Sequence, residues 1–173
     1  NQTNDTVTAR GKTRHSGLEA QTRYALGELS PALDNLSVYA SYAYVNAEIR
    51  EKGDTYGNQV PFSPKHKGTF GVDYKPGSWT FNFNGDFQSS QFADNANTVA
   101  ESADGSTGRI PGYMLWGARV AYDFGPQMAN LNLALGVKNI FDHAYYTRSY
   151  DDNNKGLYAG QPRTLYLQGT MKF

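Results

Sequence analysis

Hydrophobic and polar residues alternate along seven segments of this chain. The clearest segment is residues 79–88, where Trp79, Phe81, Phe83, Gly85 and Phe87 take every second position and polar residues fill the positions between them. A period of two is the pattern of a β-strand with one apolar and one polar face. The same pattern predicts strands over residues 6–26, 36–48, 69–74, 113–123, 130–138 and 165–173. No segment has a competing helical period.

The connections between these segments alternate between short turns and long polar loops. The long loops cover about residues 50–65, 92–112 and 140–163, while the short turns contain Pro31, Pro76-Gly77 and Gly125-Pro126. Antiparallel strands joined in this way are typical of outer-membrane barrels, which have short periplasmic turns and long extracellular loops. The pattern therefore predicts an all-β fold, a transmembrane antiparallel β-barrel. If Phe173 ends at the periplasmic side, all three long loops are extracellular.

The alternation also assigns a direction to each side chain. Charged residues fall on the face opposite the apolar one, and we expect them to face the lumen of the barrel: Asp73, Asp86, Arg119 and Lys138. Five aromatic residues on the apolar face come at the periplasmic ends of their strands, where an aromatic girdle belongs: Tyr24, Tyr74, Trp79, Tyr122 and Phe173.

A soluble β-sandwich is the alternative fold, because its strands also alternate between apolar and polar residues. Turns of similar length would be expected in a sandwich, and charged residues would not be needed on its inner face. The barrel is the better account of the pattern.

Composition narrows the choice of function. The 173 residues carry 16 basic and 16 acidic side chains, so the net charge of zero gives no basic field for nucleic acid. The chain has no Cys, which excludes a disulfide framework, a thiolate metal site and a catalytic thiol. The chain has no run of about 18 apolar residues, so the sequence does not predict a transmembrane helix. Because the chain starts at Asn1 without Met or a signal peptide, we expect a fragment or a processed product.

Candidate chemistry is sparse. His15, His66 and His143 are far apart in the sequence, and the acidic and amide residues 151–154 resemble half of a calcium loop but lack its Glu at the twelfth position. No spacing groups a nucleophile with a base. We therefore expect no resident metal, no cofactor, no catalytic residue and no enzymatic activity.

Three motifs carry a resemblance to a known family. They are residues 136–142 (Gly-Val-Lys-Asn-Ile-Phe-Asp) with Tyr145-Tyr146 and the later Gly-Gln-Pro-Arg of residues 160–163, the segment Arg14–Glu19, and the segment Pro61–Lys67. In this order, and with a last strand ending in Phe, they resemble the carboxy-terminal end of TonB-dependent outer-membrane receptors.

The resemblance implies a roughly 22-stranded barrel with an amino-terminal plug. Residues 1–173 would supply the last seven strands of that barrel. The plug and the earlier strands would then be absent from residues 1–173. The implied partners are membrane lipids, an iron–siderophore ligand and the energy-transducing protein TonB, which would bind the absent amino-terminal part. The implied location is the outer membrane of a Gram-negative cell.

Within this family, the loop at residues 148–164 most resembles that of receptors for ferric dicitrate. Their ligand-contacting Asn and Gln correspond to Asn153 and Gln2 of this sequence. The resemblance also implies that the basic residues that balance an anionic chelate lie outside residues 1–173. Two alternatives stay open, namely a receptor for another siderophore and a passive porin or adhesin barrel.

Overall fold

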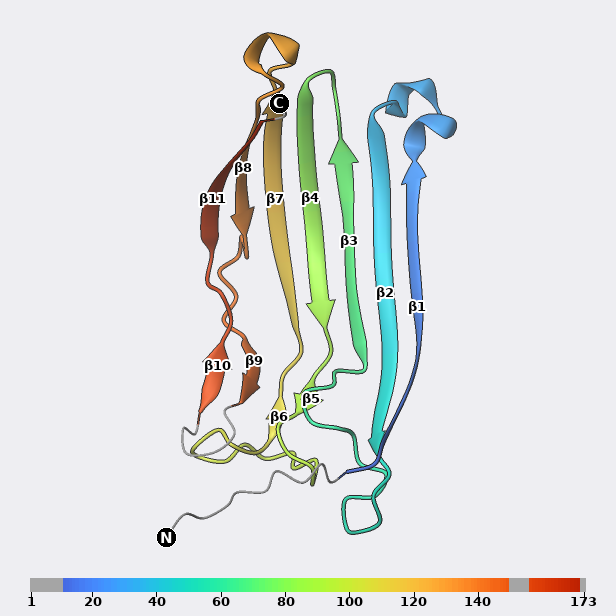
Figure 1. The fold of residues 1–173 in the computed structure, drawn as a ribbon, viewed down its shortest axis with the longest axis vertical. Coiled ribbons are helices and arrows are strands. Elements are labelled where there is room, and N and C mark those ends of the chain that lie inside the picture. The colour runs from blue at the N-terminus through green and yellow to red at the C-terminus, as the bar shows by residue number, and fades with distance from the viewer. Residues whose placement is uncertain (1–10, 150–155, 172–173) are drawn as a thin grey trace.

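One antiparallel sheet of seven strands forms most of the molecule. The structure is a computed structural model, and it describes residues 11–149 and 156–171. Along the sheet the strand order is β1-β2-β3-β4-β7-β8-β11, so neighbours in the sheet are also successive long segments of the chain (Figure 1). The strands are β1 (Thr13–Ala25), β2 (Leu36–Ile49), β3 (His66–Tyr74), β4 (Trp79–Gln88), β7 (Tyr113–Asp123), β8 (Asn132–Lys138) and β11 (Thr164–Thr170). All seven predicted strands are present, but the first begins at Thr13: Gly11 and Lys12 are not in a strand, and residues 6–10 lie outside the described residues.

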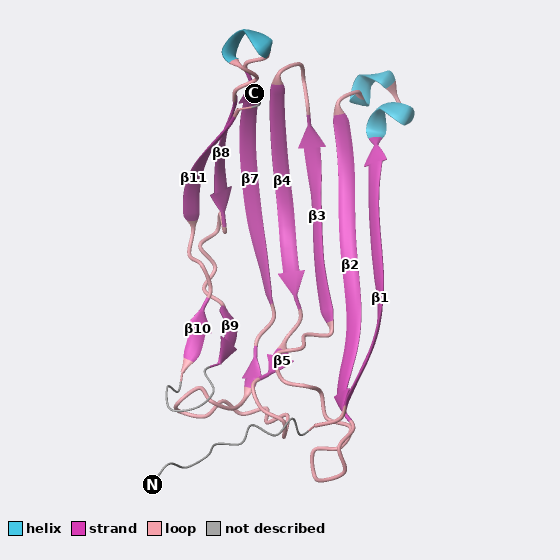
Figure 2. Ribbon diagram, in the orientation of Figure 1, coloured by secondary structure: helices cyan, strands magenta, loops and turns pink. Residues whose placement is uncertain are grey.

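Several short elements were not expected from the sequence. Two pairs of short strands lie in the loops: β5 (Gln91–Phe92) with β6 (Arg109–Ile110), and β9 (Tyr146–Ser149) with β10 (Leu157–Ala159). Three single turns of 3-10 helix occupy the short connections, namely η1 (Leu26–Glu28), η2 (Pro31–Leu33) and η3 (Pro126–Met128) (Figure 2). Strands of two to four residues are too short to display a period, which is why alternation did not reveal them.

The end of the first predicted strand needs a correction. Leu26 was expected on the apolar face of a strand, but it begins η1, and β1 ends at Ala25. The next turn, η2, starts at Pro31, a residue favoured at the first helical position, and the hydroxyl of Ser30 accepts a hydrogen bond from the Ala32 N–H. These signals belong to η2, whereas η1 has no side-chain cap of its own.

The strand register confirms the predicted facing of the side chains. Across four neighbouring strands, Val72 pairs with Phe83, Phe83 with Ala118, and Ala118 with Val137. Paired residues point to the same side of a sheet, so these apolar side chains share one face. The polar partners align in the same way, since Asp73 pairs with Asn82 and Asn82 with Arg119.

The apolar face is not covered by any second layer in the described part of the chain. Many of its large side chains are exposed, from 38% for Leu133 to 77% for Leu167. The buried hydrophobic residues are few and mostly small: Ala47, Ile49, Ala93, Ile110, Ala121 and Ala134. A soluble sandwich would bury the apolar face against another sheet, so the sandwich alternative is wrong for the described residues.

Aromatic rings meet at the short-turn end of this apolar face. Trp79 contacts Phe81 and Tyr122, with ring centroids 5.9 and 4.7 Å apart, and Phe81 contacts Tyr74 at 6.1 Å. Tyr24 is 39% exposed in β1. The row matches the predicted girdle, except that Phe173 lies outside the described residues.

The three long loops gather at one end of the sheet and the short turns at the other (Figure 1). This is the arrangement predicted from the alternation of loop lengths. No helix in the described residues is long and apolar enough to cross a membrane.

Candidate functional site

The residues predicted to contact a ligand, Asn153 and Gln2, both lie outside the described residues and stay predictions. The three long loops are therefore the candidate site. We use first loop for residues 50–65, second loop for residues 93–108 and third loop for residues 139–163. All three lie at the same end of the sheet.

The first and second loops are joined by an asparagine that acts like a strand partner. The side-chain oxygen of Asn97 accepts a hydrogen bond from the Gln59 N–H (2.7 Å), and its amide nitrogen donates to the Gln59 carbonyl (2.8 Å). Asn58 also donates to the Asn95 carbonyl at 2.9 Å. Both polar groups of the Gln59 backbone are thus satisfied from the second loop, and this fixes the two loops relative to each other.

A buried glutamine links the start of the second loop to the third. Gln91 is 2% exposed, and its side-chain nitrogen donates to the Thr147 carbonyl at 2.6 Å. The Arg148 guanidinium lies 5.4 Å from the ring centroids of Phe62 in the first loop and Tyr158 in the third. The three loops therefore form one connected cluster. These contacts join residues far apart in the chain, so no local sequence pattern predicted them.

Asp94 organises the second loop. Its carboxylate accepts hydrogen bonds from the Gly108 N–H (3.2 Å), the Thr98 N–H (3.3 Å) and the Thr98 hydroxyl (3.0 Å). Burial acts to raise the pKa of Asp94, but these hydrogen bonds outweigh it and hold the pKa below its ordinary value. The carboxylate thus closes the loop across residues 94–108.

A folded-state pKa below the unfolded one makes the closure of the second loop sensitive to acid. The contribution of Asp94 is fully present above its unfolded pKa of about 3.9 and is lost as the pH falls through the lower folded value. We expect Asp94→Asn to loosen the loop at pH 7 by about 1 kcal/mol and to abolish its dependence on pH below about 4. Hydrogen exchange of residues 97–108 in the full-length receptor, corrected for intrinsic rates, measures this. The exposed Asp54 gives the control variant Asp54→Asn. Equal protection in both variants would contradict the assignment.

The base of the third loop is held by a buried asparagine from the 136–142 motif. Asn139 is 4% exposed, and its side-chain nitrogen donates to the carbonyls of His143 (3.0 Å) and Gln161 (3.1 Å). Its oxygen accepts from the His143 N–H at 2.9 Å. Asn139 has a φ of 51°, a left-handed conformation that Asn tolerates better than most residues. One side chain therefore joins the two arms of the loop.

The other residues of the motif strengthen this base. The Asp142 carboxylate accepts a hydrogen bond from the Arg163 N–H at 2.7 Å, and the Gly160 N–H donates to the Tyr145 carbonyl at 2.7 Å. Gly160 lies so close to the Tyr145 ring that a side chain there would collide with it. The motif of residues 136–142, 145–146 and 160–163 thus forms the base of the third loop.

Below the loops, the polar face of the sheet carries a network of paired side chains. The Arg23 guanidinium forms an ion pair with Asp73 at 2.6 Å and lies 4.9 Å from the centroid of the Tyr39 ring. Asn82 donates to Asp73 at 2.8 Å and to the Tyr39 hydroxyl at 3.0 Å. We call this face the polar wall. It confirms the predicted inward side of the sheet.

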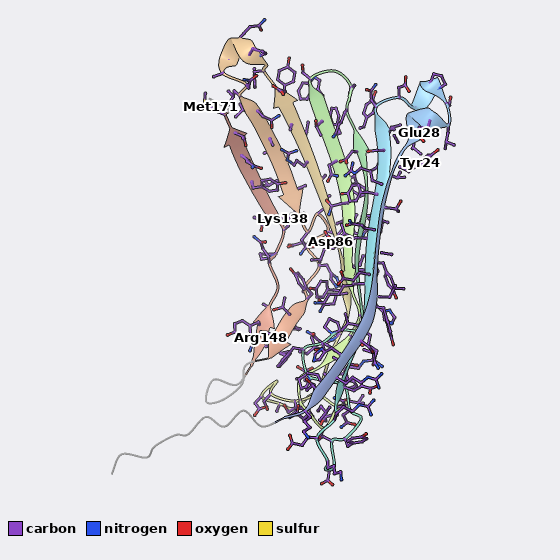
Figure 3. The ribbon with its side chains drawn as sticks, turned by 45° about the vertical axis from the view of Figure 1, so that its right-hand side comes forward. Tyr24, Glu28, Asp86, Lys138, Arg148 and Met171 are labelled. Atoms are coloured by element: carbon purple, nitrogen blue, oxygen red, sulfur yellow. The ribbon has the colours of Figure 1, made fainter. Side chains whose placement is uncertain are left out.

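Two of the hollows on the polar wall share a lining residue. The larger, about 610 Å³, lies over β1 to β7, and the smaller, about 330 Å³, lies over β4, β7 and β8. Asp86 lines both and accepts hydrogen bonds from Thr69 (2.6 Å) and Asn84 (2.7 Å). Figure 3 places Asp86 and Lys138 at similar heights along the sheet.

The three histidines take part in separate local contacts. His66 shares a hydrogen bond of 2.7 Å with the Tyr42 hydroxyl, and His15 contacts the Thr13 hydroxyl at 3.3 Å. The backbone N–H of His143 belongs to the base of the third loop. Within residues 11–149 and 156–171, no group of three or more His, Asp or Glu is placed to hold a metal ion.

Comparison with known proteins gives one matching family. A family model described as TonB dependent receptor-like, beta-barrel, matches residues 1–140. The metal-pseudopaline receptor CntO of Pseudomonas aeruginosa is 28% identical over 169 residues, which cover 94% of this chain and 21% of that protein. The ferrichrome outer membrane transporter/phage receptor of Escherichia coli is 27% identical, with 94% and 20% covered.

Solved structures agree with this family. The ferric citrate transporter FecA in its unliganded form is 85% identical, with a TM-score of 0.91, and the match covers 100% of this chain and 26% of that one. The siderophore receptor PiuA from Acinetobacter baumannii is 21% identical with a TM-score of 0.70, covering 94% of this chain and 22% of that one, a likeness of fold alone. The chain spans about a fifth of the length of the curated relatives and about a quarter of the FecA chain.

Proposed function

The chain belongs to the TonB dependent receptor-like β-barrel family, and from this membership we propose that residues 1–173 form the carboxy-terminal part of an outer-membrane receptor barrel. The family is one of receptors and transporters rather than of enzymes. The exposed apolar face of the sheet would contact the lipids of a Gram-negative outer membrane. The short turns would then face the periplasm, and the three long loops would face outward.

The ligand we propose is ferric citrate. The observation that carries this proposal is the 85% identity with the ferric citrate transporter FecA over the whole length of this chain. The relatives named for metal-pseudopaline and ferrichrome are 28% and 27% identical, so a receptor for a different metal chelate is the second candidate. Membership of the family disfavours the passive porin or adhesin.

The loop cluster suits the capture of such a ligand. The hydrogen bonds between Gln59 and Asn97 and between Gln91 and Thr147 fix the loops before a ligand arrives. A preordered site loses less conformational entropy on binding than a disordered one. Binding would be non-covalent, and import would use energy from TonB acting on a part of the receptor outside residues 1–173.

We expect Asn153→Ala to weaken the binding of ferric citrate by the full-length receptor. One or two hydrogen bonds from the amide to the chelate would be lost, at a cost of about 1 to 2 kcal/mol. Equilibrium titration of the purified receptor measures the change. Asn154→Ala removes the neighbouring amide and serves as the control. Equal affinity of both variants and the wild type would take Asn153 out of the site, and Gln2→Ala tests the second predicted contact in the same assay.

The function itself is tested by growth under iron limitation. A strain that lacks the full-length gene should fail to grow with ferric citrate as the sole iron source, and the restored gene should rescue it. Growth that does not depend on the gene would refute ferric citrate as the ligand. Parallel cultures with ferrichrome or another siderophore would then test the second candidate.

A further inference from the structure

Two cations of the polar wall, Arg119 and Lys138, lie next to each other. Arg119 of β7 pairs with Gly136 of β8, so Lys138 is its diagonal neighbour on the same face, at about 7 to 8 Å. In the described residues, the ion pairs involve other side chains, and neither Arg119 nor Lys138 forms one. This differs from Arg23 on the same wall, which is neutralised by Asp73.

The smaller hollow of the polar wall, about 330 Å³, opens beside these two cations. The size falls at the lower end of the range for small-molecule sites. Its lining includes Asn82, Asn84, Tyr145, Gln161 and Tyr166.

The polar groups around the hollow favour an anion. The ammonium of Lys138 lies 5.8 Å from the centroid of the Tyr166 ring, and the half-buried Arg119 contributes its guanidinium. The Tyr145 hydroxyl accepts a hydrogen bond from the Gln161 N–H at 3.2 Å, which leaves its own proton free to donate.

The one carboxylate in the lining does not neutralise both cations. Asp86 already accepts hydrogen bonds from Thr69 and Asn84, and its single charge leaves the lining with one net positive charge. Arg119 is half-buried, and a partly buried cation is costly unless an anion compensates it. A bound carboxylate group would supply that compensation.

The hollow also lies where an imported ligand would pass. Asn139, Tyr145 and Gln161 in its lining belong to the base of the third loop, and its charged lining residues lie on the polar wall below that base: Asp86, Arg119 and Lys138. A ligand released from the loops towards the periplasmic side would meet this part of the wall next.

We propose that Arg119 and Lys138 bind a carboxylate group of a small polycarboxylate anion, at a second position below the three loops. This inference rests on the proposed function, because ferric citrate is a chelate of that class. Both residues would act as binding groups for the charge of the ligand. The family resemblance implied that the basic residues that balance an anionic chelate lie outside residues 1–173. Arg119 and Lys138 would be two such residues inside that range.

The test is the affinity of the full-length receptor, purified in detergent, for ferric citrate at low ionic strength. Arg119→Gln and Lys138→Gln should each raise the dissociation constant of this second position about tenfold, the loss typical of a hydrogen bond to a charged group. Arg119→Lys keeps the charge and should retain most of the affinity. Lys75→Gln removes an exposed cation from the short turn between β3 and β4 and should bind as the wild type does. Free citrate is titrated in parallel, and a loss confined to ferric citrate would identify the chelate as the ligand.

The outcomes separate this inference from the proposed function. If the wild type binds ferric citrate and both glutamine variants bind it equally well, the inference is wrong and the function stands. If the two variants keep their affinity but unfold more readily than Lys75→Gln, the cations pair with acidic groups within the receptor, which also overturns the inference. A wild-type receptor that does not bind ferric citrate would refute the proposed function itself.

Discussion

Replacing Asn139 with alanine is expected to open the base of the third loop and to lower its local stability by about 2 to 4 kcal/mol. The substitution leaves the N–H of His143 and the carbonyls of His143 and Gln161 without their partner. It also places alanine at a φ of 51°, which costs about 1 kcal/mol more. Hydrogen exchange of the full-length receptor should show the loss at the amides of His143, Gly160 and Arg163.

Two further variants of Asn139 separate the causes. Asn139→Gly relieves the backbone strain but loses the same hydrogen bonds, so it should recover only about 1 kcal/mol of the loss. Asn139→Asp keeps the acceptor for the His143 N–H and loses the two donated hydrogen bonds, so it should be intermediate. Protection that stays at the wild-type level in Asn139→Ala would show that the loop base is held by other contacts.

The seven long strands and their facing could be predicted because the information is local. In each strand the side chains alternate between lipid and lumen, so a single segment such as residues 79–88 reveals its own period. Loop length added the orientation, since it placed residues 50–65, 92–112 and 140–163 on one side. The limits appear at the end of β1, where Leu26 begins a turn of 3-10 helix and does not continue the alternation.

The contacts between the loops could not be predicted, because they depend on which distant segments meet. The pairing of Asn97 with Gln59 and of Gln91 with Thr147 joins residues 38 and 56 positions apart. Nothing in a polar loop marks one amide as the partner of another. Asn97 and Asn139 share one weak signal, since Asn is favoured at positive φ, and both adopt it.

The motif residues of the third loop have a structural role that the sequence did not reveal. From the sequence, residues 136–142 and 160–163 indicated a family but not a physical role. In the structure, Asn139, Asp142 and Gly160 connect the two arms of the loop. These residues would influence ligand binding by positioning the loop and not by touching the ligand.

The second large effect is expected for Leu165→Arg, which places a charge on the apolar face of β11. Leu165 is 74% exposed and pairs with Val137, which lies in register with Ala118 and Phe83. That row is four residues from the girdle residue Trp79, or about 13 Å along the strand, which brings it near the middle of the membrane. An arginine there should destabilise the inserted full-length barrel by about 2 to 4 kcal/mol.

The control for Leu165→Arg is Gln168→Arg, in the same strand but on the polar face. The register pairs Gln168 with Ala134, so its side chain points to the lumen, where an arginine stays hydrated. Refolding of both variants into lipid vesicles, followed by denaturant titration, measures the difference in the free energy of unfolding. The polar-face variant should stay within about 1 kcal/mol of the wild type. Equal losses in both variants would mean that the apolar face of this sheet does not contact lipid, and the transmembrane orientation of all seven strands would then be wrong, since one register links them.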